Sequence, residues 1–185
     1  MVLMPMNSLT DEQLVQKYLG KDDKALEGLI KRYLPIIFGF VKRYTGNQDT
    51  ASDVAQEVFV KVWKNLKNFD QSKSFRTWIF TIAKRTAIDE LRKKNALPFS
   101  VLKENGFPES IVDESPSIPD QIFAQEQSRK LSAALARLPV GYNSVINLYS
   151  NNGLNFREIA ILLNEPLNTV KSRYRRGLAL LRKLL

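Results

Sequence analysis

The sequence predicts an all-α protein that consists of two small helical domains joined by a flexible acidic linker. Apolar residues recur at helical spacing in both halves of the chain, and strand-like alternation is scarce throughout its 185 residues. Two basic segments flank an acidic segment that contains several prolines. These observations place a first domain at residues 9–94, a linker at 95–121 and a second domain at 122–185.

The first domain begins with a series of capped helices. Thr10 and Gln13 resemble a capping box, and Asp22 or Asp23 can cap the helix that follows. Pro35 is expected to break or kink the chain, because proline lacks a backbone N–H and clashes with the preceding turn. The residues expected to end these helices are Gly20 and Gly46.

A longer helix with two contrasting faces is predicted from Asp49 or Thr50 to about Leu66. Carboxylates at Asp49, Asp53 and Glu57 repeat at i,i+4, which destabilises an isolated helix by ~0.2–0.5 kcal/mol per pair. The repeat indicates a basic partner surface, and a solvated polar face is the alternative. A metal site lacks the histidine or further acidic cluster that it would need. The face toward the core carries Ala51, Ala55, Val58, Phe59, Val62 and Leu66, and the opposite face carries Asp53, Gln56, Glu57, Val60 and Lys64.

A basic, aromatic helix is predicted from Phe75 to about Lys94, opened by one of the serines that precede it. Trp78 and Phe80 lie about 200° apart around this helix, so at least one of the two rings should reach the surface. Cations beside an accessible ring suit single-stranded nucleic acid, because the ring stacks on bases while the cations hold phosphates. The alternative is that both rings are buried at the borders of a wide apolar stripe. The candidate contacts are Lys73, Phe75, Arg76, Trp78, Phe80, Lys84 and Arg85.

The second domain ends in a helix-turn-helix pattern. Asn155 can cap a short helix over 156–163, and Pro166 cannot continue it. Asn168 or Thr169 is expected to cap a second helix that runs to about Leu184. Its first half offers hydroxyl and guanidinium groups to a major groove, while an αα-hairpin with a solvated basic face is the alternative. The groups on this face are Thr169, Ser172, Arg173 and Arg176.

Composition narrows the class of function. The chain has 28 Lys and Arg against 19 Asp and Glu, a formal net charge of +9, which indicates nucleic acid or a membrane surface as partner. Cysteine and histidine are absent, which removes disulfides, thiol catalysis, the commonest metal ligand and the commonest general base. No apolar stretch approaches the ~20 residues of a membrane span, and the residues 1–6 lack the basic region of a signal peptide, so membrane insertion is not expected.

Four sequence stretches occur in a specific order. The first is DVAQEVFVKVW from residue 53, and the second runs from FD at residue 69 to FRTWIFTIA from residue 75. The third is AIDELRKK from residue 87, and the fourth consists of LP at residue 138, EIA at residue 158 and TVKSR at residue 169. Together they resemble the bacterial RNA polymerase sigma factors of the sigma-70 family, in the extracytoplasmic-function (ECF) group. The resemblance covers nearly the whole chain, from about residue 9 to residue 183. It implies a region 2 domain, a variable linker and a region 4 domain.

The resemblance implies a promoter-specificity subunit that binds core RNA polymerase, opens promoter DNA and directs initiation, without an active site or cofactor of its own. Asp53, Gln56, Glu57, Val60 and Lys64 would then bind the clamp of the largest polymerase subunit. The flap of the second-largest subunit is a further implied partner, as is a cognate anti-sigma factor, and the implied location is cytoplasmic.

The same resemblance assigns the nucleic-acid contacts. The helix from Phe75 and the loop over 67–74 before it would capture and open the −10 element, in a pocket formed largely by that loop. Base extrusion costs a few kcal/mol, which stacking and the pocket must return. The −35 duplex would be recognised by the second helix of the helix-turn-helix, where Lys171 joins Thr169, Ser172, Arg173 and Arg176.

The chain departs from its apparent relatives at several positions. Many relatives have Asn where Arg85 stands, Arg where Asn143 stands and Gly where Asn168 stands. The acidic linker takes the place of a promoter-binding region of larger sigma factors, and its anions are expected to mimic nucleic acid in the RNA exit path. These anions include Glu104, Glu109, Asp113 and Glu114.

Two other classes of protein fit the residues less well. A free-standing helix-turn-helix regulator would not explain the acidic face at Asp53 and Glu57, and no dimerisation heptad is visible. A carboxylate-metal nuclease would need histidine or a tight acidic cluster, and a nucleotide-binding enzyme a G-x-x-x-x-G-K loop, none of which the sequence contains.

Overall fold

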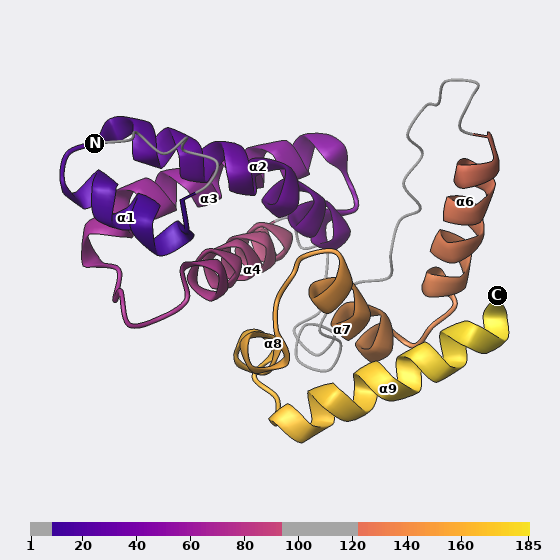
Figure 1. Cartoon of the computed structure of the whole chain (residues 1–185). Helices are drawn as coiled ribbons and strands as arrows, with labels where there is room; N and C mark the ends of the chain where they lie inside the picture. The colour runs from indigo at the N-terminus through magenta and orange to yellow at the C-terminus, as the bar shows by residue number, and fades with distance from the viewer. Residues whose placement is uncertain (1–8, 94–121) are drawn as a thin grey trace. The chain divides into compact units, whose positions relative to one another are not determined.

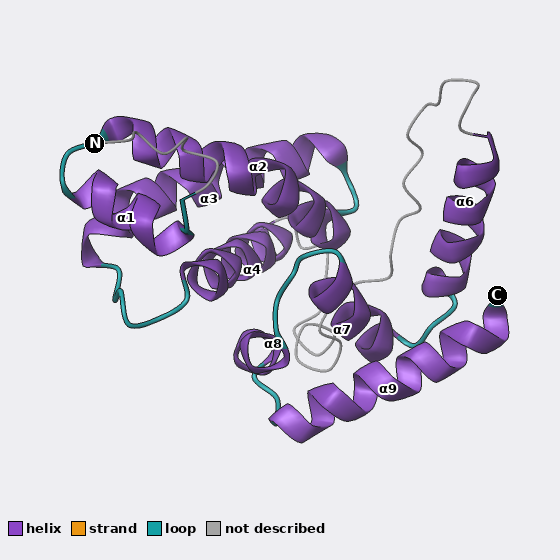
Figure 2. Cartoon of the chain, in the orientation of Figure 1, coloured by secondary structure: helices purple, strands orange, loops and turns teal. Residues whose placement is uncertain are grey.

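The computed structural model describes residues 9–93 and 122–185, except for the side chains of 122–128. All regular elements in these ranges are helices, which confirms the all-α prediction (Figures 1 and 2). They form two compact units, one on each side of the segment 94–121. The predicted acidic linker lies outside the described residues, as do residues 1–6, and the domain boundaries stay predictions. No helix in the described part of the chain is long and apolar enough to cross a membrane.

The first unit follows the predicted capping pattern. Thr10 and Gln13 form a capping box, in which the Gln13 amide donates to the Thr10 hydroxyl at 3.2 Å and the Thr10 amide donates to the Gln13 side chain at 2.9 Å. Asp22 caps the second helix, and Gly46 ends it in the left-handed conformation with φ 66°. The third helix starts slightly earlier than predicted, because Asn47 is its N-cap. The elements are α1 (Asp11–Leu19), α2 (Asp23–Thr45), α3 (Gln48–Asn65), the 3₁₀ turn η2 (Leu66–Asn68) and α4 (Phe75–Lys93).

Pro35 does not break the chain into two helices, which corrects one of the two outcomes predicted from the sequence, a break or a kink. It lies inside the continuous helix α2, where its missing N–H leaves the carbonyl of Lys31 without the usual helical bond. Buried residues occur on both sides of the proline, at Tyr33 and at Ile37 and Phe40. Because both halves of α2 are anchored in the same core, tertiary packing offsets the local cost of the proline.

The core of the first unit is aromatic and lies between α2, α3 and α4. Phe40 of α2 meets Phe80 of α4 edge to face, with ring centroids 4.9 Å apart. Tyr33 of α2 meets Phe75 of α4 in the same manner at 5.4 Å. Helix α3 contributes the predicted apolar face, although Phe59 is only half-buried. This packing fixes which faces of α3 and α4 remain available to partners.

A polar network ties α1 to α2 and α4. Arg32 donates to the Asp11 carboxylate at 2.6 Å and to the carbonyl of Leu9 at 2.8 Å. The Tyr33 hydroxyl donates to the other oxygen of the Asp11 carboxylate, and the Arg76 Nε donates to the Tyr33 hydroxyl at 3.4 Å. Burial raises the pKa of the Tyr33 hydroxyl above its ordinary value, and the hydrogen bond to Asp11 adds to the effect, so Tyr33 remains the donor.

Replacing Asp11 by Ala should therefore destabilise the first unit by ~1.5–3 kcal/mol, because a partly buried guanidinium and hydroxyl lose a charged acceptor. The matched control is Glu12→Ala, one residue further along α1, where the side chain is exposed and the change should stay within ~0.5 kcal/mol. Urea unfolding followed by circular dichroism measures both. Equal midpoints for the two variants would show that the network contributes nothing to stability.

The second unit contains the predicted helix-turn-helix. Asn155 caps α8 and forms a capping box with Glu158, as the sequence indicated. Asn164 ends α8 in the left-handed conformation with φ 57°. The second helix of the motif begins at Leu167, with Pro166 in the N-cap position, so the predicted capping role of Asn168 or Thr169 is wrong. The elements are α6 (Ile122–Ala136), α7 (Val140–Ser150), α8 (Phe156–Leu163) and α9 (Leu167–Leu184).

Helices α7 and α9 approach closely at Gly177. A Cβ atom at this position would lie 2.9 Å from Cδ1 of Ile146 and 3.1 Å from Cβ of Tyr142. Ile146 belongs to a buried cluster with Leu138 and Leu181, so it has little room to move. Gly177 therefore permits the crossing that holds α9 against the unit and leaves its basic face outward.

Candidate functional site

The outer face of α3 carries the predicted polymerase-binding residues. Asp53, Gln56 and Lys64 are exposed, and Val60 is 47% exposed. Glu57 is partly exposed and forms an i,i+4 ion pair with Lys61 at 2.9 Å. The acidic repeat therefore lies on the surface, where it is available to a basic partner.

The sequence analysis missed one exposed aromatic residue on this face. Trp63 is 55% exposed and lies at i+3 from Val60 and i+7 from Gln56, along one side of α3. The signal for Trp63 in the sequence was a large apolar side chain at a position outside the buried face of α3. Val60 and Trp63 give the acidic face an apolar centre, which is the composition of a protein–protein interface.

Helix α4 separates the predicted DNA-contacting aromatics into two groups. Phe75 and Phe80 are fully buried, which corrects their assignment as DNA contacts, because neither ring is accessible to a base. Trp78 is partly exposed and packs on Phe69, with centroids 4.9 Å apart. Of the two rings that could not share one core, Trp78 is therefore the one at the surface. The long-range contact with Phe40 decides this outcome.

The predicted cations near α4 are unequally placed. Arg76 is half-buried, with its guanidinium carbon 6.0 Å from the centre of the Tyr33 ring, so it acts within the α1–α2–α4 network. Lys84 is half-buried and Arg85 is exposed. Lys73 is exposed and pairs with Asp70 at 3.3 Å in the loop before α4.

Asp70 organises this loop. Its carboxylate accepts hydrogen bonds from the hydroxyl of Ser72 at 2.7 Å and from the backbone amide of Ser72 at 3.0 Å. These bonds, with Lys73 nearby, hold the pKa of Asp70 below its ordinary value. The loop thereby keeps a defined turn that leads into α4, where the Ser74 hydroxyl accepts from the amide of Thr77 at 3.3 Å.

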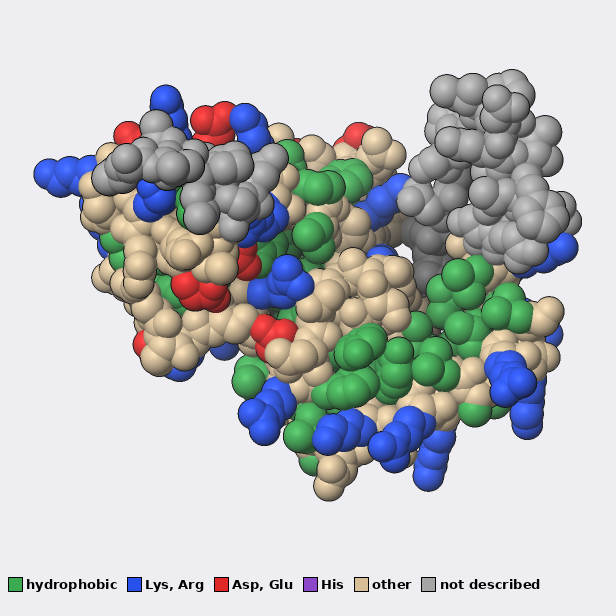
Figure 3. Space-filling view, viewed as in Figure 1, with side chains coloured by type: hydrophobic (Ala, Val, Ile, Leu, Met, Phe, Trp, Pro, Cys, Tyr) green, Lys and Arg blue, Asp and Glu red, His purple; other side chains and the backbone are tan. Residues whose placement is uncertain are grey.

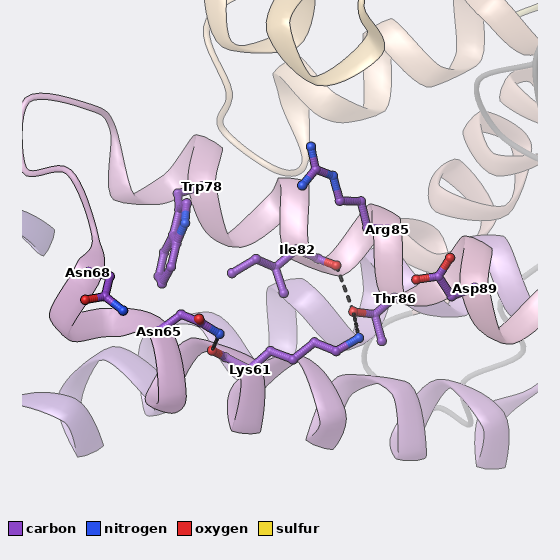
Figure 4. A pocket seen from close by; sticks show the side chains of 8 residues that line it. All are labelled: Lys61, Asn65, Asn68, Trp78, Ile82, Arg85, Thr86 and Asp89. Atoms are coloured by element: carbon purple, nitrogen blue, oxygen red, sulfur yellow. Dashed lines mark hydrogen bonds between the residues drawn. The ribbon is translucent and has the colours of Figure 1, made fainter.

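A pocket of about 490 Å³ lies between α3 and α4 (Figure 4). Trp78 and Ile82 come from α4, and Asn65 and Lys61 reach toward them from α3. Lys61 is held in place, since it donates to the Thr86 hydroxyl at 3.0 Å. The pocket thus combines an aromatic wall with polar groups. The full lining is Lys61, Asn65, Asn68, Trp78, Ile82, Arg85, Thr86 and Asp89.

In the second unit, the predicted duplex-contacting residues gather on one face of α9, except for Lys171, which lies on another side of the helix. Thr169, Ser172, Arg173 and Arg176 line a hollow of about 390 Å³ together with Tyr142 and Asn168. Figure 3 shows Lys and Arg side chains in a row at the lower edge, along the helix that Figure 1 labels α9. The exposed cations of this helix are Lys171, Arg175, Arg176, Arg182 and Lys183.

Arg173 differs from the other cations on this face. Its Nη1 atom donates to Oε1 of Glu165 at 2.7 Å, and both side chains are partly buried. The guanidinium also lies beside Gly141, where an added Cβ would be 3.1 Å from it. The sequence analysis did not predict Glu165 as a site residue, because its partner Arg173 lies on the other side of the turn of the helix-turn-helix. Arg173 therefore holds the turn of the helix-turn-helix while it lines the hollow.

Two positions that depart from the apparent relatives have defined places here. The side-chain amide of Asn143 donates to the carbonyl of Leu135 at 2.8 Å, and so joins α7 to the end of α6. Asn168 lines the hollow on α9. Among the described side chains, in residues 9–93 and 129–185, no three carboxylates come together as metal ligands would.

Comparison with known proteins identifies both units. The family model for Sigma-70 region 2 matches residues 29–96, and the model for Sigma-70, region 4 matches residues 128–181. The ECF RNA polymerase sigma factor SigW of Bacillus subtilis is 33% identical over 183 residues, covering 94% of this chain and 98% of that relative. The ECF RNA polymerase sigma-E factor of Escherichia coli K12 is 31% identical over 170 residues, covering 89% and 88%.

A solved structure has the same fold. The sigma factor RpoE from Bartonella quintana, crystallised with the anti-sigma factor NepR, aligns with a TM-score of 0.63 at 22% identity, covering 87% of this chain and 96% of that one. The family assignment rests on the sequence relatives, and the similarity to this solved structure shows that the fold is the same. The resemblance found in the sequence is thus confirmed: the chain belongs to the ECF RNA polymerase sigma factors, which are promoter-specificity subunits that direct transcription initiation.

Proposed function

We propose that the first unit binds both core RNA polymerase and the melted −10 element, through different helices. The outer face of α3, with Asp53, Gln56, Glu57, Val60 and Lys64, binds the basic clamp of the largest subunit. The pocket beside Trp78 receives an unpaired base. The observation that carries this assignment is the accessible Trp78 ring beside a polar pocket, on a helix whose other aromatics are buried.

The second unit binds the −35 element as a duplex. The face of α9 with Thr169, Ser172 and Arg176 enters the major groove, where the exposed Arg176 contacts a base. Lys171 is a further contact from another side of α9, because it lies about 200° around the helix from Thr169. Arg173 contributes mainly by holding the turn through Glu165. The flap of the second-largest polymerase subunit is a further partner of this unit.

Three further properties belong to the same proposal. The nucleotide chemistry and its metal belong to the polymerase, so this chain needs no active site or cofactor of its own. Its location is cytoplasmic, where the polymerase and the promoter are. A cognate anti-sigma factor regulates it, which is supported by the fold shared with a sigma factor solved in complex with one.

Promoter opening tests the role of Trp78. Replacing Trp78 by Leu should reduce open-complex formation by about 5- to 150-fold, because stacking on an aromatic ring contributes ~1–3 kcal/mol per base. Fluorescence of 2-aminopurine in the −10 element measures opening by the reconstituted holoenzyme. Trp78→Phe keeps a ring and should retain most activity, and both variants should bind core polymerase normally. If Trp78→Leu opens DNA as well as the wild type, the base-stacking role is wrong.

Duplex binding tests the role of α9. Arg176→Ala should weaken holoenzyme binding to DNA that carries the −35 element by ~1–3 kcal/mol, because a bidentate contact is lost. Arg182→Ala removes the same charge from an exposed position six residues further along α9, and should cost less and equally for all sequences. Competition binding with specific and scrambled duplexes separates the two effects. If both variants lose the same affinity for specific and for scrambled duplexes, Arg176 contacts phosphate and not a base.

A further inference from the structure

A carboxylate reaches the basic face of α9 from the turn of the helix-turn-helix. The segment 157–185 is strongly basic, and its carboxylates are Glu158 and Glu165. Glu158 accepts a hydrogen bond from the backbone amide of Asn155 in the capping box of α8. Glu165 instead pairs with Arg173, whose Nη1 atom donates to Oε1 at 2.7 Å. An acidic group therefore lies within a surface that otherwise suits DNA.

The backbone of the turn fixes the place of Glu165. Its amide donates to the carbonyl of Ala160 at 3.0 Å, and the amide of Asn164 donates to the carbonyl of Ile161 at 3.2 Å, which together close the end of α8. Pro166 follows directly and disfavours a helical conformation at the residue before it. The carboxylate thus extends from a rigid turn toward a guanidinium eight residues further along the chain.

The guanidinium of Arg173 is enclosed on two sides. Glu165 holds it from the turn, and Gly141 in the first turn of α7 lies so close that an added Cβ would be 3.1 Å from Nη1. The ion pair also offsets the repulsion between Arg173 and Arg176, which lie at i,i+3 on the same helix. Arg173 borders the hollow of α9, but its charge is already balanced within the protein.

The second oxygen of the Glu165 carboxylate indicates that this residue acts through Arg173. Oε2 is buried and accepts no hydrogen bond from the part of the chain that the structure describes. A buried acceptor without a partner costs stability, so the turn gains nothing from this carboxylate apart from the bond to Arg173. Because Oε2 is shielded, an approaching DNA strand would meet the guanidinium before the carboxylate.

We propose that Glu165 is a specificity-determining residue, which holds Arg173 as a bond across the turn and so keeps it away from DNA phosphates. This inference rests on the proposed function, because it requires that α9 binds duplex DNA. A contact between a cation and a phosphate strengthens binding to every sequence and carries no sequence information. The fixed turn, by contrast, keeps the start of α9 in the orientation that base contacts need. Glu165 thereby lowers sequence-independent affinity without an equal loss at the −35 element.

The first test measures binding of the full chain to a short duplex of scrambled sequence by fluorescence anisotropy. Glu165→Gln keeps the size of the side chain and removes its charge, and Glu165→Ala removes the acceptor as well. Both variants should bind this duplex about three- to tenfold more tightly at about 0.1 M salt, and the slope of log K against log salt should become steeper by about 0.9, as one added phosphate contact requires. A change that only damaged the turn would lower the affinity instead.

Two further variants show whether the gain depends on Arg173. Combining Glu165→Gln with Arg173→Ala should return the affinity and the salt slope to wild-type values, because the added phosphate contact is then lost. Glu27→Gln is the matched control, since Glu27 is an exposed carboxylate of α2 that pairs with Lys31 at 2.6 Å. This control frees a cation in the other unit and should change neither quantity.

The second test measures the sequence preference of holoenzyme reconstituted with core RNA polymerase. Its probes are a promoter duplex that the wild-type holoenzyme selects from a random library, and the same duplex with the −35 element scrambled. The ratio of the two affinities should fall about threefold or more in both Glu165 variants, because the added phosphate contact favours the two duplexes alike while the start of α9 is less well fixed.

The outcomes separate this inference from the proposed function. The role of Glu165 is wrong if neither variant gains affinity and salt slope on scrambled DNA, if the gain persists without Arg173, or if the preference of the holoenzyme is unaltered. A wild-type holoenzyme that binds both promoter duplexes equally would instead contradict recognition of the −35 element by α9, which is the proposed function itself.

Discussion

Reversing the charge of Asp53 and Glu57 to Lys should abolish stable binding to core RNA polymerase. Both side chains lie on the outer face of α3, so the reversal would place two cations against a basic clamp. Like charges across an interface cost several kcal/mol, which corresponds to a loss of about a hundredfold or more in affinity. Co-elution of the purified chain with core polymerase in size-exclusion chromatography measures the effect, and fluorescence anisotropy gives the Kd.

A matched reversal distinguishes the α3 face from net charge. Asp23 and Glu27 are exposed carboxylates of α2 with the same i,i+4 spacing, and their change to Lys adds the same charge away from α3. This control should bind core polymerase nearly as well as the wild type. Equal loss in both double variants would attribute the effect to overall charge. Retained binding in the α3 variant would remove this face from the interface, and tight binding to duplex DNA without polymerase would favour a free-standing regulator.

Replacing Phe80 by Ala should be among the most destabilising changes in the first unit. The ring is fully buried and meets Phe40 edge to face at 4.9 Å. Truncation of a buried Phe costs ~3–5 kcal/mol, against a total stability of ~5–15 kcal/mol for a typical domain. The first unit should therefore lose a large share of its stability and unfold at a much lower urea concentration than in the wild type.

The two tryptophans make this effect measurable in the whole chain. Trp63 and Trp78 both lie in the first unit, so tryptophan fluorescence during urea unfolding reports on that unit alone. The control is Leu34→Ala on α2, where the side chain is 45% exposed and the cost should be ~0.5 kcal/mol or less. If Phe80→Ala and Leu34→Ala unfold at the same urea concentration, Phe80 does not have the core role described above.

Much of the architecture could be predicted from the sequence, because it depends on interactions within one or two helical turns. The capping box of Thr10 and Gln13, the left-handed end of α2 at Gly46 and the cap of Asn155 on α8 are all bonds between near neighbours. The acidic outer face of α3 also follows from periodicity alone, since a helix that buries one stripe must expose the other. These features were predicted and are confirmed.

The predictions from the sequence are wrong at positions whose environment depends on residues distant in the sequence. Pro35 remains helical because both halves of α2 are packed in one core, which no local rule about proline contains. The periodicity showed that Trp78 and Phe80 could not share a face, but only the contact of Phe80 with Phe40 shows which ring is buried. The sequence had also assigned Phe80 to DNA binding, and burial contradicts that assignment.

The sequence by itself determined the helical class, the division of the chain by charge, the family and the surfaces on which the predicted functional residues lie. The tertiary structure decided which members of those surfaces are available. Trp78 is at the surface, Arg76 is held by Tyr33, Arg173 is held by Glu165, and Arg85 is left exposed beside a pocket. The physical reason is that helical periodicity fixes the direction of a side chain, whereas its exposure and its ion pairs depend on neighbours that folding brings from elsewhere in the chain.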